Sequence, residues 1–341
     1  MRAQACILGC AGPTLTPEEA AFFRDVQPWG FILFARNVEA PDQVRRLTAA
    51  LRETVGRLDA PILVDQEGGR VQRLKAPHWR SYPPGRAYGR LAGNDPLLKR
   101  EIARLGARLI AHDLAALGIN VDCLPVLDVP DPSGHEIIGD RAYGQSPDEV
   151  AMLGRAAAEG LIAGGVLPVV KHIPGHGRAM ADSHLALPVV EAPLTELDGR
   201  DFAPFRALSD MPMAMSAHVI FSAIDGDRPG TTSRKLIREV VRGAIGFDGL
   251  LMTDDLSMKA LTGGFTERAR DSLAAGCDVV LHCNGDMGEM RAVVAGVGEL
   301  KGRAARRAAA ALARIPRRPE PLDVAEATAR FEAAFEGRSA A

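Results

Sequence analysis

The chain has 341 residues, of which 47% are apolar and 25% charged, so it is long and apolar enough to fold around a large core. Its 35 glycines and 23 prolines are spread without a short repeat, which excludes a collagen-like or coiled-coil protein. The 41 basic and 43 acidic side chains give a net charge of -2, and neither sign forms a long block. We therefore expect no nucleic-acid partner and no membrane partner.

The five cysteines are odd in number, lie mostly in apolar runs and lack Cys-x-x-Cys spacing, so we expect reduced, buried thiols in a cytoplasmic protein. No apolar stretch approaches the ~18 residues of a spanning helix. The Ile-Leu-Gly-Cys sequence that ends at Cys10 resembles a lipoprotein cleavage site. Too few residues precede it for the ~7–15-residue apolar core of a secretory signal, and we expect a first strand there.

Short apolar runs recur along the chain, and each is followed by a stretch with helical spacing. The eight runs span residues 5–8, 30–34, 61–64, 119–127, 167–170, 211–215, 250–252 and 277–281. Continuous apolar strands that alternate with helices indicate a parallel sheet covered on both faces, and eight units without a glycine-rich dinucleotide turn favour closure. We predict an α/β fold in which residues 1–341 form a single-domain (β/α)8 TIM barrel, with extra outer helices from about residue 303.

Several helix ends carry recognisable signals. The amphipathic segment 98–117 is followed by a glycine suited to a C-cap. Ser146, with proline next and Glu149 three residues later, predicts a capping box. Hydroxyl N-caps are also expected at Thr195 and Ser233, each followed by apolar residues at helical spacing.

Barrel enzymes carry their reacting groups at the carboxyl ends of the strands, where the loops diverge. A single polar residue there is most often just a side chain leaving the sheet, but polar groups after five strands together favour a functional site. The polar residues that follow the runs are Asp65, Gln66 and Glu67; Lys171 and His172; Ser216 and His218; Thr253, Asp254 and Asp255; and His282 and Asn284.

The sequence KHIPGHG at 171–177 contains two glycines and a proline, which predicts a mobile or unusually shaped loop after the fifth strand that could move over a ligand. Asp182 and His184 follow, two positions apart. An aspartate that orients an imidazole and favours its protonated form is typical of a general acid. Taken without its neighbours, the same Asp-Ser-His sequence is better explained as a surface turn.

Asp254 lies two residues after an apolar run and can serve as a nucleophile, a base or a metal ligand at the barrel mouth. The neighbouring Asp255 is better suited to capping the next segment.

Two acids and two arginines gather around a Gly-Gly pair in residues 65–73, and Arg141 adds a third guanidinium from the loop after the fourth strand. Such an array offers acceptors and donors for sugar hydroxyl groups. An internal salt-bridge network at a helix start is the alternative, and it would account for Glu67 and Arg70.

Taken in order, six segments resemble the bacterial β-N-acetylhexosaminidases of glycoside hydrolase family 3. They are FILFARN at 31–37, VDQEGGRVQR at 64–73, GDRAYG at 139–144, KHIPGHG at 171–177, DSH at 182–184 and MTDDLSM at 252–258. Ile173 stands where the family often has phenylalanine, and Ala142-Tyr143 replaces a Ser-Phe-like pair. Neither departure changes a reacting group.

The resemblance implies a monomeric, cytoplasmic enzyme of peptidoglycan recycling that uses neither metal nor cofactor. Its partner would be a small carbohydrate: it would release N-acetylglucosamine, with retention, from muropeptides that end in 1,6-anhydro-N-acetylmuramic acid, with or without peptide. Asp254 would be the nucleophile, His184 the acid/base and Asp182 its partner. The residues that would hold the sugar are Asp65, Arg73, Arg141, Lys171 and His172. Other branches of the family use a carboxylic acid/base from a second domain, and the His184 assignment depends on that difference.

Three alternatives remain open at this point. His172, His176, Asp182 and His184 could surround zinc in a metal-dependent hydrolase, although no His-Glu-x-x-His helix supports it. The barrel could bind sugar without turnover. Phosphate rather than water could accept the glycosyl group, because a histidine repels an anion less than a carboxylate does.

Overall fold

Eight parallel strands close into a barrel in the computed structural model, which describes residues 3–92, 95–131, 137–179 and 187–336. Every predicted run overlaps one barrel strand, and chain order is also the order around the barrel. The strands are β1 (Gln4–Gly9), β2 (Pro28–Leu33), β3 (Ile62–Val64), β6 (Val121–Asp122), β7 (Leu167–Ile173), β9 (Met213–Ser216), β11 (Leu250–Asp255) and β12 (Val279–His282). The predicted (β/α)8 barrel is confirmed.

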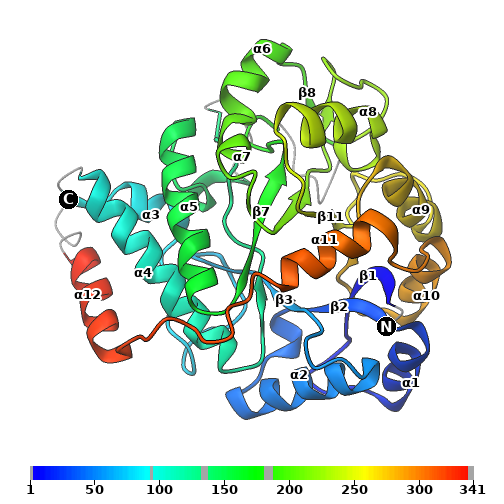
Figure 1. Cartoon of the computed structure of the whole chain (residues 1–341), viewed down its shortest axis with the longest axis horizontal. Helices are drawn as coiled ribbons and strands as arrows, with labels where there is room; N and C mark the ends of the chain where they lie inside the picture. Colours follow the sequence, from blue (N-terminus) through cyan, green and yellow to red (C-terminus); the bar gives the residue numbers. More distant parts are fainter. Residues whose placement is uncertain (1–2, 93–94, 132–136, 180–186, 337–341) are drawn as a thin grey trace.

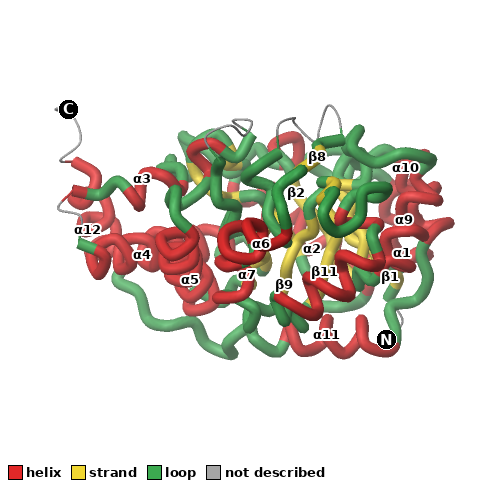
Figure 2. Tube along the Cα trace, turned by 90° about the horizontal axis from the view of Figure 1, so that it is seen from above, coloured by secondary structure: helices red, strands yellow, loops and turns green. Residues whose placement is uncertain are grey.

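Helical segments follow each strand and cover the outside of the barrel, as Figures 1 and 2 show. The α-helices are α1 (Pro17–Val26), α2 (Pro41–Val55), α3 (Gly85–Gly89), α4 (Pro96–Ala115), α5 (Pro147–Ala163), α6 (Leu194–Glu196), α7 (Ala203–Ala207), α8 (Arg234–Leu236), α9 (Phe265–Ala275), α10 (Met287–Gly296), α11 (Gly302–Leu312) and α12 (Val324–Glu336). The π-helical turns Leu197–Asp201 and Ile237–Ala244 continue α6 and α8.

Both faces of the strands are buried, which explains why the runs are continuously apolar. On β1, Ile7 belongs to the core inside the barrel, and the next residue, Leu8, packs under the outer helices. On β7, Val169 points inward and Val170 outward. Successive strand residues alternate between the two cores, so the inward positions can be counted along each strand up to its carboxyl end.

The helix signals were confirmed in part. Ser233 caps α8 by accepting from the N–H of Leu236. Ser146 caps α5 through the N–H of Glu149, but the Glu149 carboxylate lies 3.7 Å from Lys99 of α4, so only half of the capping box forms. The cap at Thr195 was wrong: α6 begins at Leu194, because Pro193 fixes the extended backbone that precedes it.

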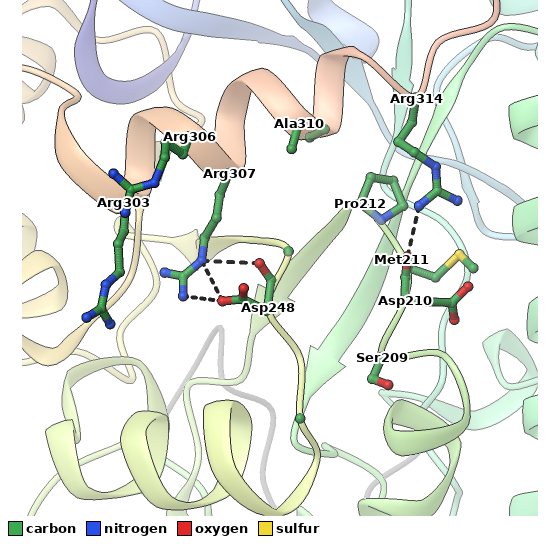
Figure 3. Close-up of a pocket in the computed structure, with 13 residues that line it drawn as sticks. Ser209, Asp210, Met211, Pro212, Asp248, Arg303, Arg306, Arg307, Ala310 and Arg314 are labelled. Carbon is green, nitrogen blue, oxygen red and sulfur yellow. Dashed lines mark hydrogen bonds and ion pairs between the residues drawn. The ribbon is translucent and has the colours of Figure 1, made fainter.

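The tail beyond residue 302 folds back onto the barrel. Figure 2 shows α11 on the side of the barrel opposite β8, and Figure 3 shows how it is held. Arg307 pairs with Asp248 and, at 3.1 Å, with buried Asp278, and Arg314 donates to the carbonyl of Asp210. The last helix, α12, lies beside α4 (Figure 1), where its Phe331 packs against Tyr82.

None of the helices in the described ranges combines the length and apolar character needed to cross a bilayer. All five cysteines are buried and free. Cys10 directly follows β1, so the expectation of a first strand there is confirmed.

Candidate active site

Three predicted site residues continue the inward-facing positions of their strands. Each lies two residues beyond an apolar side chain of the inner core: Asp65 beyond Leu63, Lys171 beyond Val169, and Asp254 beyond Met252. Because side chains alternate along a strand, the period of two turns these groups into the barrel mouth. The register that buries the core therefore also assembles the site.

Five charged side chains form a continuous ion-pair network on one side of this mouth. Lys171 Nζ lies 2.8 Å from Asp65 Oδ1 and 2.6 Å from Glu67 Oε1. Arg73 Nη2 lies 3.0 Å from Asp65 Oδ2, and Arg141 holds both oxygens of Glu67, with Nε at 2.8 Å and Nη2 at 2.7 Å. Positive and negative groups alternate in the order Arg73, Asp65, Lys171, Glu67 and Arg141.

Opposite charges keep this network ionised despite its burial. Lys171 is only 2% exposed. Burial alone would raise the pKa of Glu67, but Arg141 and Lys171 lower it to about 2. Burial opposes ionisation of Asp65 too, and Lys171 with Arg73 holds its pKa below the usual range. In turn the two carboxylates raise the pKa of Lys171 above its ordinary value, although burial works against them.

A small hairpin carries the acids and Arg73 of this network. β4 (Gln66–Gly68) pairs antiparallel with β5 (Val71–Gln72), so the segment is not a helix start. The salt-bridge alternative was right that Glu67 is paired, but among the described residues Arg70 contacts Asp140, at 3.3 Å, and not Glu67. The buried Gln66 amide oxygen accepts from the N–H groups of Arg73 and Leu74, each at 3.0 Å. The Arg73 guanidinium also lies over the Phe34 ring, 4.9 Å from its centroid, and is held from two sides.

The KHIPGHG sequence is not wholly a loop. β7 runs through Lys171 and His172 to Ile173, three residues beyond the predicted strand, because its backbone continues to pair with its neighbours. One cis peptide bond, Lys171–His172, lies within β7, and a second, Ile173–Pro174, joins the strand to the turn formed by the rest of the motif. A Cβ at Gly177 would lie 1.9 Å from the carbonyl oxygen of Val129, so this close approach requires glycine.

Asp128, which the sequence interpretation passed over, lies fully buried behind this motif. Its Oδ2 is 2.7 Å from His172 Nδ1, and its Oδ1 accepts from the backbone N–H groups of His172 at 3.2 Å and His176 at 2.7 Å. Asp128 directly follows the apolar run 119–127. The rule that identified the other rim residues, a polar group after a run, would have identified it as well.

Asp254 occupies the other side of the mouth. Among the described residues its carboxylate accepts one hydrogen bond, from the N–H of Asp255 at 2.8 Å. Burial would raise its pKa, but nearby His172 and His218 hold the pKa below the ordinary aspartate value. The ring of His218 is buried, and its Nε2 lies 3.1 Å from the carbonyl oxygen of Asp255, which fixes the backbone beside Asp254.

Asp255 has the capping role expected of it. Its carboxylate accepts from the N–H and the hydroxyl of Ser257 and from the N–H of Cys283 at 3.2 Å. These bonds tie the turn after β11 to the end of β12. Asp254, in contrast, does not bind the described residues of this turn through its carboxylate, apart from the N–H of Asp255.

One pocket of about 190 Å³ collects the predicted residues that the structure describes. Its walls include Asp65, Arg73, Arg141, Lys171, His172 and Asp254. The larger cleft of about 620 Å³ beside α11 (Figure 3) is lined by none of them. Asp182 and His184 lie outside the described residues. Within the described ranges, no group of three or more His, Cys, Asp and Glu side chains is arranged to hold a metal ion.

Comparisons with known proteins agree with this geometry. The model of the glycosyl hydrolase family 3 N-terminal domain matches residues 13–317. The chain belongs to glycoside hydrolase family 3. It is 39% identical over 285 residues to the Beta-hexosaminidase of Nitrosomonas eutropha, covering 82% of this chain and 80% of that one.

Two solved family 3 structures superpose on nearly the whole chain. NagZ from Neisseria gonorrhoeae is 32% identical with a TM-score of 0.83, and the match covers 98% of this chain and 96% of that one. A beta-N-acetylglucosaminidase from Paenibacillus sp. str. FPU-7 is 32% identical with a TM-score of 0.85. The match covers 97% of this chain but only 66% of that longer protein. The predicted family is therefore confirmed.

Proposed function

We propose that this family 3 glycoside hydrolase is a retaining exo-β-N-acetylglucosaminidase that removes one N-acetylglucosamine from the non-reducing end of muropeptides. The hexosaminidase activity is supported by the curated relatives, which bear the name Beta-hexosaminidase, and by NagZ and the Paenibacillus enzyme as structural neighbours. The substrate would be N-acetylglucosaminyl-1,6-anhydro-N-acetylmuramic acid, with or without peptide. The reaction would then belong to peptidoglycan recycling.

The observation that carries this proposal is the division of one small pocket into two chemically different sides. The ion-pair network offers a carboxylate acceptor at Asp65 and charged donors at Arg73 and Lys171, the mixture that neighbouring sugar hydroxyls require. Asp254 faces the same cavity. A volume of about 190 Å³ lies below the ~300–1,000 Å³ of sites for drug-sized ligands, which suits one sugar ring held at a closed end.

In the first step, Asp254 would attack the anomeric carbon and form a glycosyl ester while the aglycone departs. The ionised state that this requires is favoured because His172 and His218 lower the pKa of Asp254 against the effect of burial. Few hydrogen bonds hold its oxygens among the described residues, so little must be broken for attack. In the second step water would release the sugar with overall retention.

His184 would protonate the departing oxygen and then accept a proton from the attacking water, with Asp182 orienting its ring. An unperturbed histidine titrates near ~6.5, between the two proton states that the double role needs near neutral pH. The assignment to His184 and Asp182 rests on the DSH motif and its resemblance to the family 3 β-N-acetylhexosaminidases.

The chain would act as one catalytic domain, a monomer in the cytoplasm, without metal or organic cofactor. The packing of α11 and α12 against the barrel supports one folding unit, and the five buried free thiols suit a reducing compartment. Full activity after chelation and dialysis is expected, and its loss with recovery on adding zinc would favour the metal-dependent alternative.

Product analysis with three substrates tests the proposal: a GlcNAc-anhydromuropeptide, an aryl β-N-acetylglucosaminide and the matching aryl β-glucoside. We expect free N-acetylglucosamine from the first two and little turnover of the third. Parallel reactions with and without inorganic phosphate would reveal a sugar phosphate if phosphate were the acceptor. Binding of N-acetylglucosamine without hydrolysis of either acetylated substrate would contradict the proposal.

A further inference from the structure

We propose that Asp128 is a positioning residue of this site, which fixes the tautomer and orientation of His172 so that ring atom Nε2 is presented to the sugar as an acceptor. The role rests on the proposed function, in which His172 helps to hold the sugar. Asp128, which controls the tautomer in this proposal, lies outside the six sequence motifs.

The contacts of Asp128 divide between its two oxygens. Oδ1 receives the backbone N–H groups of His172 and His176, at 3.2 and 2.7 Å, and so holds the turn. Oδ2 receives only the ring, at 2.7 Å from His172 Nδ1. Within the described ranges no lysine or arginine pairs with this carboxylate. One oxygen therefore shapes the backbone, and the other acts on the ring alone.

The direction of the ring hydrogen bond follows from the charge of Asp128. Oδ1 accepts two backbone N–H groups and Oδ2 lies 2.7 Å from a ring nitrogen, so hydrogen bonds to both oxygens favour the ionised carboxylate in spite of its burial. An ionised carboxylate only accepts, so the hydrogen must be on Nδ1 of His172. In the neutral ring, Nε2 is then left with a lone pair.

The second ring nitrogen is free for a ligand. His172 lines the pocket together with Asp65, Lys171 and Asp254, and Nε2 has no hydrogen-bond partner among the described residues. The cationic side chains of the network only donate to sugar oxygens, so each hydroxyl also needs an acceptor for its own hydrogen. Nε2 supplies such an acceptor in the pocket that the network and Asp254 also line.

Asparagine at position 128 separates the two roles of the carboxylate. If its oxygen keeps the two backbone N–H groups, its NH₂ group faces Nδ1 of His172. An amide nitrogen only donates, so the ring must accept at Nδ1 and carry its hydrogen on Nε2. Asp128→Asn therefore retains the turn and inverts the tautomer.

The experiment combines nitrogen-15 NMR of histidine-labelled enzyme with kinetics on an aryl β-N-acetylglucosaminide. We expect the Nδ1–H tautomer for His172 in the wild type and the Nε2–H tautomer in Asp128→Asn, with kcat/KM lowered roughly 10- to 100-fold, the effect known for carboxylates that orient metal-binding histidines. In a His172→Ala background, adding Asp128→Asn should change kcat/KM by less than about twofold, because the ring on which Asp128 acts is absent.

Asp278→Asn is the matched control. Asp278 is buried as well and accepts from a backbone N–H, that of Leu251 at 2.9 Å, but it pairs with Arg242 and Arg307 outside the pocket. The Asp278→Asn variant should keep the wild-type tautomer of His172 and a kcat/KM near the wild-type value.

Two results would overturn the proposal. An Nε2–H tautomer of His172 in the wild type would do so without any variant, even if Asp128→Asn failed to fold. Equal losses from Asp128→Asn with and without His172 would show that the aspartate only supports the turn. Failure of the proposed function is distinguishable, because an enzyme that hydrolyses no N-acetylglucosaminide would still report its tautomer by NMR.

Discussion

The two sides of the pocket differ in how their charges are satisfied. On the network side, Asp65 and Glu67 each contact two cationic side chains, so each buried carboxylate is compensated. On the opposite side, Asp254 is lowered in pKa by nearby histidines and, among the described residues, accepts a single backbone hydrogen bond. In the proposed function, the sugar would be recognised by groups that are fixed before it arrives, whereas the proposed nucleophile accepts few hydrogen bonds.

The proposed difference between the two sides of the pocket is tested most directly at Asp254. Asp254→Ala should lower kcat on both the muropeptide and the aryl glycoside by roughly 10⁴-fold or more, because no covalent intermediate can form. Trapping with a slow fluorosugar followed by peptide mass spectrometry should place the label on Asp254. Normal turnover by the alanine variant, or a label on another residue, would contradict its role.

The proposed acid/base can be separated from the nucleophile by its dependence on the leaving group. His184→Ala should lower turnover of the muropeptide by roughly 10²–10⁴-fold, the usual contribution of general acid catalysis. Formation of the glycosyl ester from an activated aryl glycoside should change far less, because that leaving group needs no proton. Pre-steady-state kinetics would measure this step, and equal losses on both substrates would argue against the role.

The network side can be probed through pH. The pKa of Glu67 is about 2, below its ordinary value of 4.5, so the stability it contributes is present above pH 4.5 and lost as the pH falls toward 2. The shift corresponds to about 3 kcal/mol in unfolding free energy. Urea denaturation between pH 2.5 and 6 should show the wild type losing more stability than Glu67→Gln.

A surface pair provides the control for that measurement. Asp248, whose side chain is 85% exposed, pairs with Arg307. Asp248→Asn should differ little from the wild type in its pH dependence, because solvent screens exposed ion pairs. Identical pH slopes for the wild type and Glu67→Gln would contradict the network's proposed strength.

The smallest expected effect is on sugar affinity. Arg73→Lys removes the planar guanidinium held between Asp65 and Phe34, and we expect KM for the aryl glycoside to rise about tenfold with a smaller fall in kcat. Arg317→Ala, an exposed change in the tail, should leave both constants near the wild-type values. A fall in kcat with unchanged KM would contradict a role of Arg73 in sugar binding and indicate a role in the chemical step.

Much of the fold was predictable because each barrel strand buries both faces and therefore reads as an apolar run. The limits of β7 were not, since its last three residues include Lys171 and His172, which no hydrophobic pattern assigns to a strand. The false N-cap at Thr195 has a similar origin. The hydroxyl group predicted a cap there, but Pro193 fixes an extended backbone and the helix begins at Leu194.

The site, like the fold, was predictable only in part. The motifs identified residues such as Asp254, and six of the eight that were named line one pocket. Asp182 and His184 lie outside the described residues, so their placement stays a prediction. Asp128 directly follows the run 119–127, so its position could have been found from the sequence, but its contacts with residues 44 and 48 positions further along the chain could not.

The sequence by itself determined which side chains enter the barrel mouth, since alternation along each strand places Asp65, Lys171 and Asp254 on the same face as the inner core. Only the tertiary structure decided how these groups are paired. Lys171 meets Asp65 across 106 positions of sequence, and Arg141 meets Glu67 across 74. Barrel closure brings such groups together, and the low polarity of the interior then makes each buried charge depend on partners that no local pattern specifies.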